Sequence, residues 1–196
     1  MNITVIGIGY VGLSNALLLA QKHTVIAYDI SAEKVETLKN GECPIEDKEA
    51  EVFLKSKNQI DFKATTNKKE AFMNAELFIV ATPTDYDTET NFFDTKKVDS
   101  VIAEISNLNP KALIVIKSTV PVGYTNKLLD RFNTNKILFS PEFLREGSSL
   151  YDNLYPSRII VGGYEIYANK FAKLLENCAK KNNIEILITN PTEAEA

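Results

Sequence analysis

The glycine-rich run at residues 7–12 constrains the fold of this chain more than any other feature. It follows directly on an apolar run at residues 2–6, which has the length and composition of a buried strand. Apolar residues then recur at helical spacing as far as Ala20, and residues 25–29 predict a second strand that ends in an acid. A strand, a glycine turn, a helix and a second strand form a βαβ unit, which is a building block of a doubly wound sheet.

Each glycine of this turn has its own role if the unit binds a dinucleotide. Gly7 permits a tight turn, Gly9 lets a pyrophosphate approach the main chain, and Gly12 lets the helix pack closely on the strand. The start of the helix offers free N–H groups and the positive end of the helix dipole to the phosphates. The turn by itself leaves two alternatives open, a glycine-rich turn without a ligand and a site for another nucleotide such as FAD.

The acid at the end of the second strand distinguishes between dinucleotides. Asp29 lies 17 residues after Gly12, where a carboxylate can accept hydrogen bonds from both hydroxyls of a ribose. A 2′-phosphate in this place would meet a like charge. We therefore expect NAD rather than NADP as the cofactor.

Strand and helix patterns alternate through the rest of the chain. Further strands are predicted at residues 60–64, 77–81, 112–116, 137–139, 157–162 and 184–188. Helices are predicted at residues 31–39, 47–58, 67–74, 94–108, 123–132 and 167–180, and a further helix is expected to begin near the last residue. Ser31 and Asp94 are expected as N-caps. This alternation predicts an α/β fold, a Rossmann-type, doubly wound and mostly parallel sheet with helices on both faces.

Charge and composition argue against several kinds of partner. The formal net charge of −4 and the pI near 5.2 argue against a nucleic-acid partner or an anionic membrane surface. No apolar run reaches about 18 residues, so no membrane span is expected. Cys43 and Cys178 are far apart and His23 is the only histidine, so we expect reduced thiols, a cytoplasmic protein and no metal site.

Three loops that follow predicted strands carry unusual polar residues. They are residues 82–84 (Thr-Pro-Thr), 117–123 and 140–147. Ligands of doubly wound sheets lie outside the carboxyl ends of the strands, so these loops should meet beside the glycine turn. Glu142 and Glu146 are four residues apart, would share a face of one helical turn, and could do acid/base chemistry. The alternative is structural, because Thr-Pro and Val-Pro are ordinary turn sequences and carboxylates favour helix N-termini.

With these loops included, the chain resembles the UDP-glucose/GDP-mannose dehydrogenase family over essentially its whole length. The matching stretches are residues 7–13, 81–84, 117–123, 140–146, 150–162 and 192–196. The most specific are the run Glu-Phe-Leu-Arg-Glu at 142–146 and the segment 150–158. The second of these is similar to the UDP-glucose branch of the family rather than to the GDP-mannose branch.

The resemblance implies oxidation of the C6 alcohol of a nucleotide sugar to a carboxylate, with two molecules of NAD⁺. In the family an aldehyde forms first and is captured by a cysteine. A second hydride transfer then gives a thioester, which water hydrolyses. On the UDP-glucose branch the substrate is UDP-glucose and the product is UDP-glucuronate.

The resemblance also implies which residues bind the cofactor. The residues that would hold the pyrophosphate are Gly7, Gly9, Tyr10, Val11 and Gly12. Asp29 would bind the adenosine ribose, with Lys34 nearby. The residues near the nicotinamide would be Thr84, Thr119 and Glu146.

Catalytic and substrate roles are implied in the same way for the second and third loops. Thr119 would position a water, and Glu146 would assist hydrolysis of the thioester. Glu142 would act near the sugar as an acid/base or as a partner of a water. The residues whose backbone would line the sugar site are Phe143, Leu144 and Arg145.

The sequence also departs from the family pattern. The family's oxyanion-binding lysine and asparagine, its long dimerising helix and its C-terminal domain with the nucleophilic cysteine would all follow Ala196. Neither Cys43 nor Cys178 matches that nucleophile. We therefore expect residues 1–196 to be the N-terminal NAD-binding domain, inactive alone, of an enzyme that is a homodimer at full length.

Two other functions remain open from the sequence. One is a stand-alone NAD-binding module. The other is a dehydrogenase for another nucleotide sugar, UDP-N-acetylmannosamine or GDP-mannose. A 3-hydroxyacyl-CoA dehydrogenase would share the glycine turn but not the run at 142–146.

Overall fold

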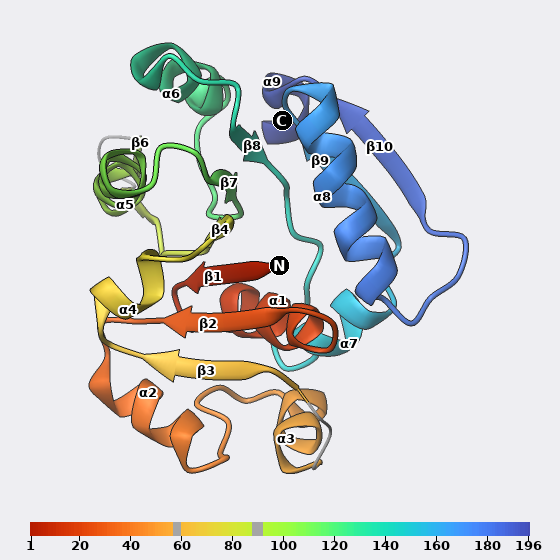
Figure 1. Cartoon of the computed structure of the whole chain (residues 1–196). Helices are drawn as coiled ribbons and strands as arrows, with labels where there is room; N and C mark the ends of the chain where they lie inside the picture. The colour runs from red at the N-terminus through yellow and green to blue at the C-terminus, as the bar shows by residue number, and fades with distance from the viewer. Residues whose placement is uncertain (57–59, 88–91) are drawn as a thin grey trace.

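The computed structural model describes residues 1–56, 60–87 and 92–196. An eight-stranded sheet runs through the molecule and is covered by helices on both faces (Figure 1). Its strands are β1 (Asn2–Ile6), β2 (Thr24–Tyr28), β3 (Phe62–Thr65), β4 (Leu77–Val80), β7 (Leu113–Ile116), β8 (Ile137–Phe139), β9 (Arg158–Gly162) and β10 (Glu185–Thr189). A separate antiparallel pair consists of β5 (Asp85–Asp87) and β6 (Phe92–Asp94). The helices are α1 (Tyr10–Ala20), α2 (Ala32–Lys39), α3 (Lys48–Lys55), α4 (Lys68–Phe72), α5 (Lys96–Leu108), α6 (Tyr124–Phe132), α7 (Ser149–Leu154), α8 (Glu165–Cys178) and α9 (Pro191–Glu195).

The strand order confirms the predicted doubly wound sheet. From one edge to the other it is β10-β9-β8-β7-β4-β1-β2-β3. The strands from β3 to β8 pair in parallel, whereas β9 meets β8 in the antiparallel sense through Gly162 opposite Phe139. Because β1, β4, β7 and β8 all end at one edge of the sheet, the loops that follow them are brought together there.

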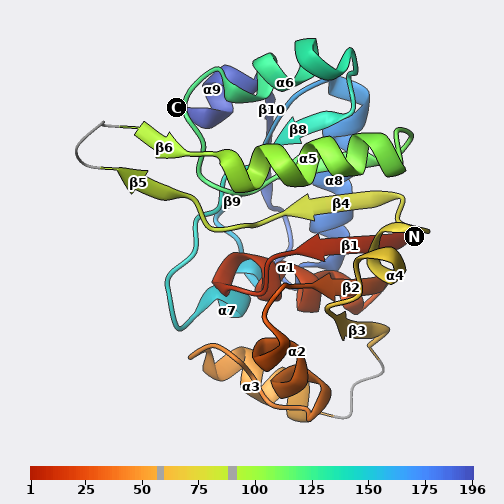
Figure 2. The ribbon, with the colours of Figure 1, turned by 90° about the vertical axis from the view of Figure 1, so that its left-hand side faces the viewer.

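Side chains alternate between the two faces of the sheet and form a core on each side. In β4, Leu77 and Ile79 join one apolar cluster with α1, α2, α3, α7 and α8, and Phe78 and Val80 join the other with α4, α5 and α6. The same alternation holds in β1, β7 and β8. Figure 2 shows β1 and β4 near the centre of the sheet. Helix α5 lies on the face nearer the viewer, and α8 lies on the opposite face. These strands are apolar at nearly every position, without alternating polar residues, because helices cover both faces of the sheet.

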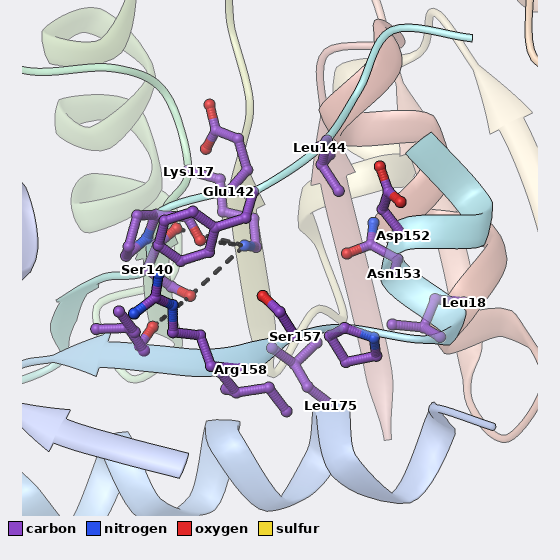
Figure 3. A pocket seen from close by; sticks show the side chains of 15 residues that line it. Leu18, Lys117, Ser140, Glu142, Leu144, Asp152, Asn153, Ser157, Arg158 and Leu175 are labelled. Atoms are coloured by element: carbon purple, nitrogen blue, oxygen red, sulfur yellow. Dashed lines mark hydrogen bonds between the residues drawn. The ribbon is translucent and has the colours of Figure 1, made fainter. Parts of the chain in front are cut away.

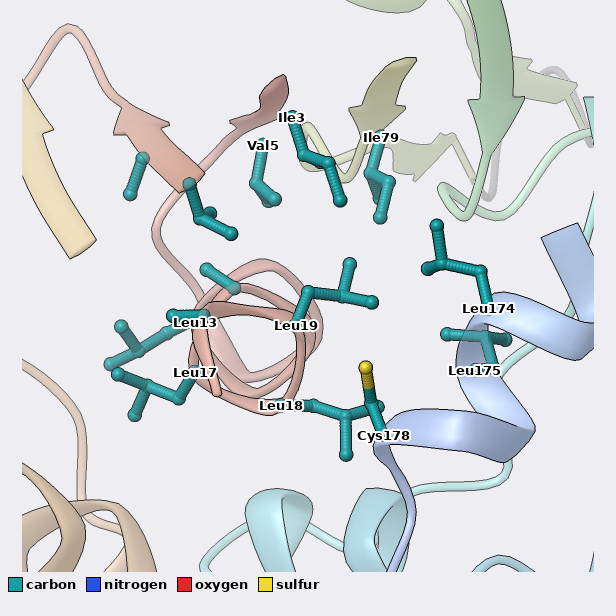
Figure 4. Packing of buried hydrophobic residues seen from close by; sticks show 14 of the residues in the cluster. Ile3, Val5, Leu13, Leu17, Leu18, Leu19, Ile79, Leu174, Leu175 and Cys178 are labelled. Carbon is teal, nitrogen blue, oxygen red and sulfur yellow. The ribbon is translucent and has the colours of Figure 1, made fainter. Parts of the chain in front are cut away.

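Helix α1 is buried on nearly every side, which fits its continuous apolar sequence. All residues from 12 to 20 are buried. Leu19 points toward the strands, Leu13 and Leu17 point to the side opposite α8, and Leu18 lies toward Cys178 of α8 (Figure 4). At 11 residues the helix is short, and among the described residues no helix is long and apolar enough to cross a membrane.

Several element boundaries differ from those that the sequence predicts. Helix α5 has Thr95 as its N-cap, not Asp94, because Asp94 ends β6 and its carboxylate accepts the Lys96 N–H (3.0 Å). Strand β3 starts at Phe62, where it comes into register with Val25 of β2. The helix predicted at 47–58 ends at Lys55, and residues 57–58 of that prediction lie outside the described residues.

Two features were not predicted at all, the pair β5–β6 and the helix α7. Both are short, with 3 residues in each strand and 6 in the helix, so neither shows a full period of its pattern. The N-terminus of α7 is fixed by Asp47, whose carboxylate accepts the Leu150 N–H at 3.0 Å from 103 positions away. A contact of that kind leaves no local signal in the sequence.

Candidate cofactor and active site

In the glycine turn between β1 and α1, the backbone at two of the three glycines is packed so closely that a side chain would not fit. Gly7 has a φ of +98°, and a Cβ there would lie 2.4 Å from the Ala81 carbonyl oxygen. A Cβ on Gly12 would lie 1.8 Å from the Gly7 carbonyl oxygen. Gly9 differs, because a Cβ on it would meet nothing within 4 Å. Gly7 and Gly12 are therefore required by packing, and Gly9 leaves open space at the start of the helix.

That open space lies at the N-terminus of α1, where backbone donors are free. Gly9 is the N-cap, and no side chain of the described residues caps the helix. The Gly9 carbonyl accepts the Leu13 N–H at 2.9 Å, so the turn continues directly into the helix. Uncapped N–H groups beside open space suit the pyrophosphate of a dinucleotide, so the cradle fits the predicted cofactor.

Asp29 is held against the glycine turn at the end of β2. Its carboxylate accepts the Ile8 N–H at 2.6 Å and the Ser31 N–H at 2.9 Å. Lys34 Nζ donates to the Ile8 carbonyl at 3.0 Å, and Ser31 is the N-cap of α2 as predicted. The structure thus brings Asp29 and Lys34 together beside the turn, with the half-buried carboxylate fixed in orientation.

The loops after β1, β4, β7 and β8 converge on one cleft of about 350 Å³, which we call the cofactor cleft. Its lining residues are Gly9, Tyr10, Val11, Ala81, Thr82, Pro83, Thr84, Lys117, Ser118, Thr119, Glu142, Leu144 and Glu146. The Ser118 hydroxyl donates to the Thr82 carbonyl (2.7 Å), which joins two of these loops. Thr84, Thr119, Glu142 and Glu146 therefore lie around the same space as the start of α1.

The acidic loop, residues 140–147, does not form the helical turn predicted for it. Residues 140–145 have no regular secondary structure, and Pro141 lies at the start of this stretch. Glu142 and Glu146 nevertheless line the same cleft. They differ in environment, because Glu146 is exposed whereas Glu142 is half-buried. Burial raises the pKa of Glu142, and the charge of Lys117 opposes that rise.

Phe143 and Arg145 point away from the cofactor cleft. The Phe143 ring is 48% exposed, and the guanidinium of Arg158 lies 5.0 Å from its centroid. Arg145 donates to both carboxylate oxygens of Asp152, at 2.7 and 3.2 Å, and its backbone N–H donates to the same group at 2.9 Å. The Arg145 side chain is thus committed to α7, which leaves the loop backbone as the part free to line a sugar site.

A second and larger cavity, about 530 Å³, lies between the acidic loop and α9, and we call it the C-terminal cavity. Its lining residues are Thr119, Val120, Phe139, Pro141, Glu142, Phe143, Ile160, Leu187, Thr189, Glu193, Ala194, Glu195 and Ala196. It shares Thr119 and Glu142 with the cofactor cleft. These two residues stand between a space beside the glycine turn and a space large enough for part of a second ligand.

Lys117 lines the cofactor cleft, although the sequence motifs predict no role for it. It is only 4% exposed, and its Nζ donates to the carbonyls of Ser140 (3.3 Å) and Pro141 (3.4 Å) (Figure 3). Burial lowers its pKa to about 8, against the opposing charge of Glu142. The available signal was a charged residue at the end of the apolar run 113–116, because a lysine buried there needs partners.

Two further carboxylates fix the loops from distant parts of the chain. Asp47, only 1% exposed, accepts the Ala50 N–H of α3 (3.0 Å) and the Ser149 hydroxyl of α7 (2.6 Å). Glu195 of α9 accepts the N–H groups of Gly123 (2.6 Å) and Thr125 (2.7 Å), and so caps α6. The contacts of Asp47 with Ser149 and of Glu195 with α6 join residues at least 70 positions apart, so spacing in the sequence does not reveal them.

In the described ranges, the cysteines lie outside the two cavities, and the acidic groups form no metal site. Cys178 is buried in the core and Cys43 is partly buried against it. Neither lines the cofactor cleft or the C-terminal cavity. No group of three or more His, Cys, Asp or Glu side chains in these ranges could hold a metal ion.

A sequence profile of the UDP-glucose/GDP-mannose dehydrogenase family, NAD binding domain, matches residues 1–179. The chain belongs to the UDP-glucose/GDP-mannose dehydrogenase family. Its cofactor is accordingly NAD, as the sequence predicts. The chain is 45% identical to the UDP-glucose 6-dehydrogenase of Campylobacter jejuni over 198 residues, an alignment that covers 100% of this chain and 50% of that protein.

Solved structures of nucleotide-sugar dehydrogenases share the fold. A UDP-glucose dehydrogenase from Pyrobaculum islandicum aligns with a TM-score of 0.84 at 28% identity, over 99% of this chain and 47% of that one. A UDP-D-ManNAc dehydrogenase from Pyrococcus horikoshii aligns with a TM-score of 0.86 at 28% identity, over 100% and 48%. The chain thus spans about half the length of the family members that it matches.

Proposed function

We propose that the chain is the cofactor half of a UDP-glucose 6-dehydrogenase, which oxidises UDP-glucose to UDP-glucuronate with two molecules of NAD⁺ by way of a cysteine thioester. The observation that carries the proposal is the convergence of the open N-terminus of α1 with Thr119, Glu142 and Glu146 on one cleft. The 45% identity to a UDP-glucose 6-dehydrogenase supports this substrate. Residues 1–196 would be the N-terminal NAD-binding domain of the longer enzyme, in which the central helix makes a cytoplasmic homodimer.

The adenosine half of NAD⁺ would lie on the glycine turn. Gly7 and Gly12 bring strand and helix together, and the N–H groups at Tyr10 and Val11 would face the pyrophosphate across the open side of Gly9. Two backbone N–H groups already orient the Asp29 carboxylate for the ribose hydroxyls. Lys34, bound to the Ile8 carbonyl, holds this corner in place.

The nicotinamide would lie in the cofactor cleft near Thr84, Thr119 and Glu146. When bound there, NAD⁺ supplies the acceptor for a hydride. Thr119 would orient a water with its hydroxyl, and the exposed Glu146 would assist that water in thioester hydrolysis. Glu142, whose pKa burial raises, would hold or pass a proton at the sugar C6 oxygen.

The sugar would lie toward the C-terminal cavity, against the backbone of residues 143–145. This cavity shares Glu142 with the cofactor cleft. The arrangement would suit transfer of a hydride from a substrate in the cavity to the nicotinamide in the cleft. The nucleophilic cysteine would come from sequence that this chain does not include, because Cys43 and Cys178 line neither space. The chain alone should therefore form no NADH from UDP-glucose.

The test compares NAD⁺ with ADP by amide chemical-shift mapping on the chain. ADP should shift the amides around Gly9 and Asp29 only, whereas NAD⁺ should also shift those of Thr119 and Glu142. If NAD⁺ shifted no amide of the loops at 117–123 and 140–147, the proposed nicotinamide site would be wrong. Absorbance of NADH, recorded after addition of UDP-glucose, checks in the same sample that the chain alone is inactive.

Another nucleotide sugar is the second candidate substrate. The solved structure of a UDP-D-ManNAc dehydrogenase is as similar in sequence, at 28%, as that of a UDP-glucose dehydrogenase. A full-length enzyme that contains this chain would decide between them. NADH formation from UDP-N-acetylmannosamine or GDP-mannose, with none from UDP-glucose, would show that the other nucleotide sugar is the substrate.

A further inference from the structure

Glu142 lies where three cavities meet. It lines the cofactor cleft, the C-terminal cavity and a third, inner cavity of about 40 Å³ behind the acidic loop. Lys117 lines the cofactor cleft and the inner cavity, so its side chain lies in the partition between them. Figure 3 shows this partition, with the lysine extending beneath the loop that carries Glu142.

The hydrogen bonds of Lys117 hold the loop but leave its positive charge unbalanced. Nζ donates to the Ser140 carbonyl (3.3 Å), the Ser140 hydroxyl (3.5 Å) and the Pro141 carbonyl (3.4 Å), all of which are neutral. A buried ammonium group with only neutral acceptors is costly unless a negative charge lies close by. The next residue of the loop, Glu142, carries such a charge.

The other charged groups around these cavities are directed elsewhere. Asp152 is bound to Arg145 through two hydrogen bonds. Arg158 lies over the Phe143 ring, and Glu146 is exposed at the rim of the cofactor cleft. At the C-terminal cavity, Glu193 accepts the Thr189 hydroxyl and Glu195 accepts two N–H groups of α6 and its cap. Within the described part of the chain, Lys117 and Glu142 are therefore the opposite charges that line both the cofactor cleft and the inner cavity, and no direct ion pair joins them.

We propose that Lys117 is a positioning residue for Glu142, whose buried ammonium group fixes the Ser140–Pro141 backbone and keeps the neighbouring carboxylate ionised beside the cofactor cleft. The inference rests on the proposed function for its catalytic meaning, because Glu142 is the proposed acid/base. It adds that the acid strength of Glu142 depends on a lysine beneath the loop. A proton lost from Lys117 would change the proton affinity of Glu142 without any contact between Lys117 and the substrate.

The directions of the pKa shifts agree with this geometry. Burial raises the pKa of Glu142 and lowers that of Lys117 to about 8, and each charge opposes the effect of burial on the other. Removal of the lysine charge should therefore raise the pKa of Glu142 further. By the same linkage, removal of the Glu142 charge should lower the pKa of Lys117 below about 8.

The experiment is an NMR titration of the Glu142 carboxyl carbon in the wild-type chain and in Lys117→Met. The pKa of Glu142 should rise by about one unit or more in the variant. Lys136→Met is the matched control, since Lys136 donates to the Lys111 carbonyl outside the cavities that Glu142 lines, and it should leave the Glu142 titration unchanged. An unchanged Glu142 pKa in folded Lys117→Met would overturn the proposal.

A reciprocal variant keeps the proposal testable if Lys117→Met does not fold. Glu142→Gln changes a half-buried loop residue, and the Lys117 Nζ can be titrated in it by NMR. Its pKa should fall, and an unchanged value would overturn the proposal. Neither titration contains NAD⁺ or sugar, so a failure of the chain to bind NAD⁺ would refute the proposed function without affecting this result.

Discussion

The glycine turn and the acidic loop form two sides of the cofactor cleft, but they are fixed in different ways. The turn is determined by neighbours in sequence, because Gly12 packs on Gly7 and the helix follows at once. The acidic loop is fixed by residues far along the chain, namely Lys117 at its start and Asp47 at the first residues of α7, which follows the loop. A backbone cradle can thus be encoded locally, whereas an irregular loop that carries acids needs buried partners from elsewhere.

The largest loss of stability is expected when a side chain is added to the glycine turn itself. Gly12→Ala would place a Cβ at 1.8 Å from the Gly7 carbonyl oxygen, so we expect a loss of about 3 kcal/mol in the free energy of unfolding. Gly9→Ala meets nothing within 4 Å and should keep wild-type stability while it weakens ADP binding. Urea unfolding and calorimetry measure the two effects. Equal stability of the two variants would contradict the packing role of Gly12.

The next effect on stability concerns Asp47, which joins α3 to the start of α7 just after the acidic loop. Asp47→Ala would leave the Ser149 hydroxyl and the Leu150 N–H without their acceptor and would uncap α3, at a cost of about 2–3 kcal/mol. ADP binding should be unchanged, because the glycine turn makes none of these contacts. Loss of ADP affinity in folded Asp47→Ala would show that the turn and the loop are not independent. Asp61→Ala, at an exposed carboxylate that accepts the Thr24 hydroxyl, is the matched control for urea unfolding.

The Asp47 carboxylate should also make the free energy of unfolding depend on pH. Burial would raise the pKa of Asp47, but its hydrogen bonds from Ser149, Ala50 and Leu150 hold it below the ordinary value. Its stabilising contribution is present above the unfolded pKa, about 3.9, and is lost as the pH falls through the lower folded pKa. The difference in unfolding free energy between wild type and Asp47→Asn should therefore shrink below about pH 4. A difference that stays constant would contradict this.

The smallest effect is expected at the cap of α6. Glu195→Ala removes the acceptor of the Gly123 and Thr125 N–H groups, which should cost about 1 kcal/mol. Glu195→Gln keeps one acceptor oxygen and should cost less. Hydrogen exchange at these two amides reports the loss directly. Exchange as slow in Glu195→Ala as in wild type would show that the cap contributes nothing.

Much of the fold and part of the site follow from the sequence because they depend on local patterns. The βαβ unit and the doubly wound, mostly parallel sheet follow from hydrophobic period and glycine spacing, and the position of Asp29 follows from the rule for strand ends. The convergence of Thr84, Thr119 and Glu146 follows from the same rule. The roles of Lys117 and of Asp47 at α7 could not be assigned, because the Ser140 carbonyl is 23 positions from Lys117 and the Ser149 hydroxyl is 102 positions from Asp47.

The most direct test of this account is a calorimetric titration of the chain with NAD⁺ and, separately, with NADP⁺. We expect NAD⁺ to bind and NADP⁺ not to bind, because the Asp29 carboxylate is fixed beside the glycine turn where a 2′-phosphate would lie. Asp29→Ala should weaken NAD⁺ binding by about tenfold or more. Binding of both dinucleotides with equal affinity, or of neither, would contradict the account of how this turn selects its cofactor.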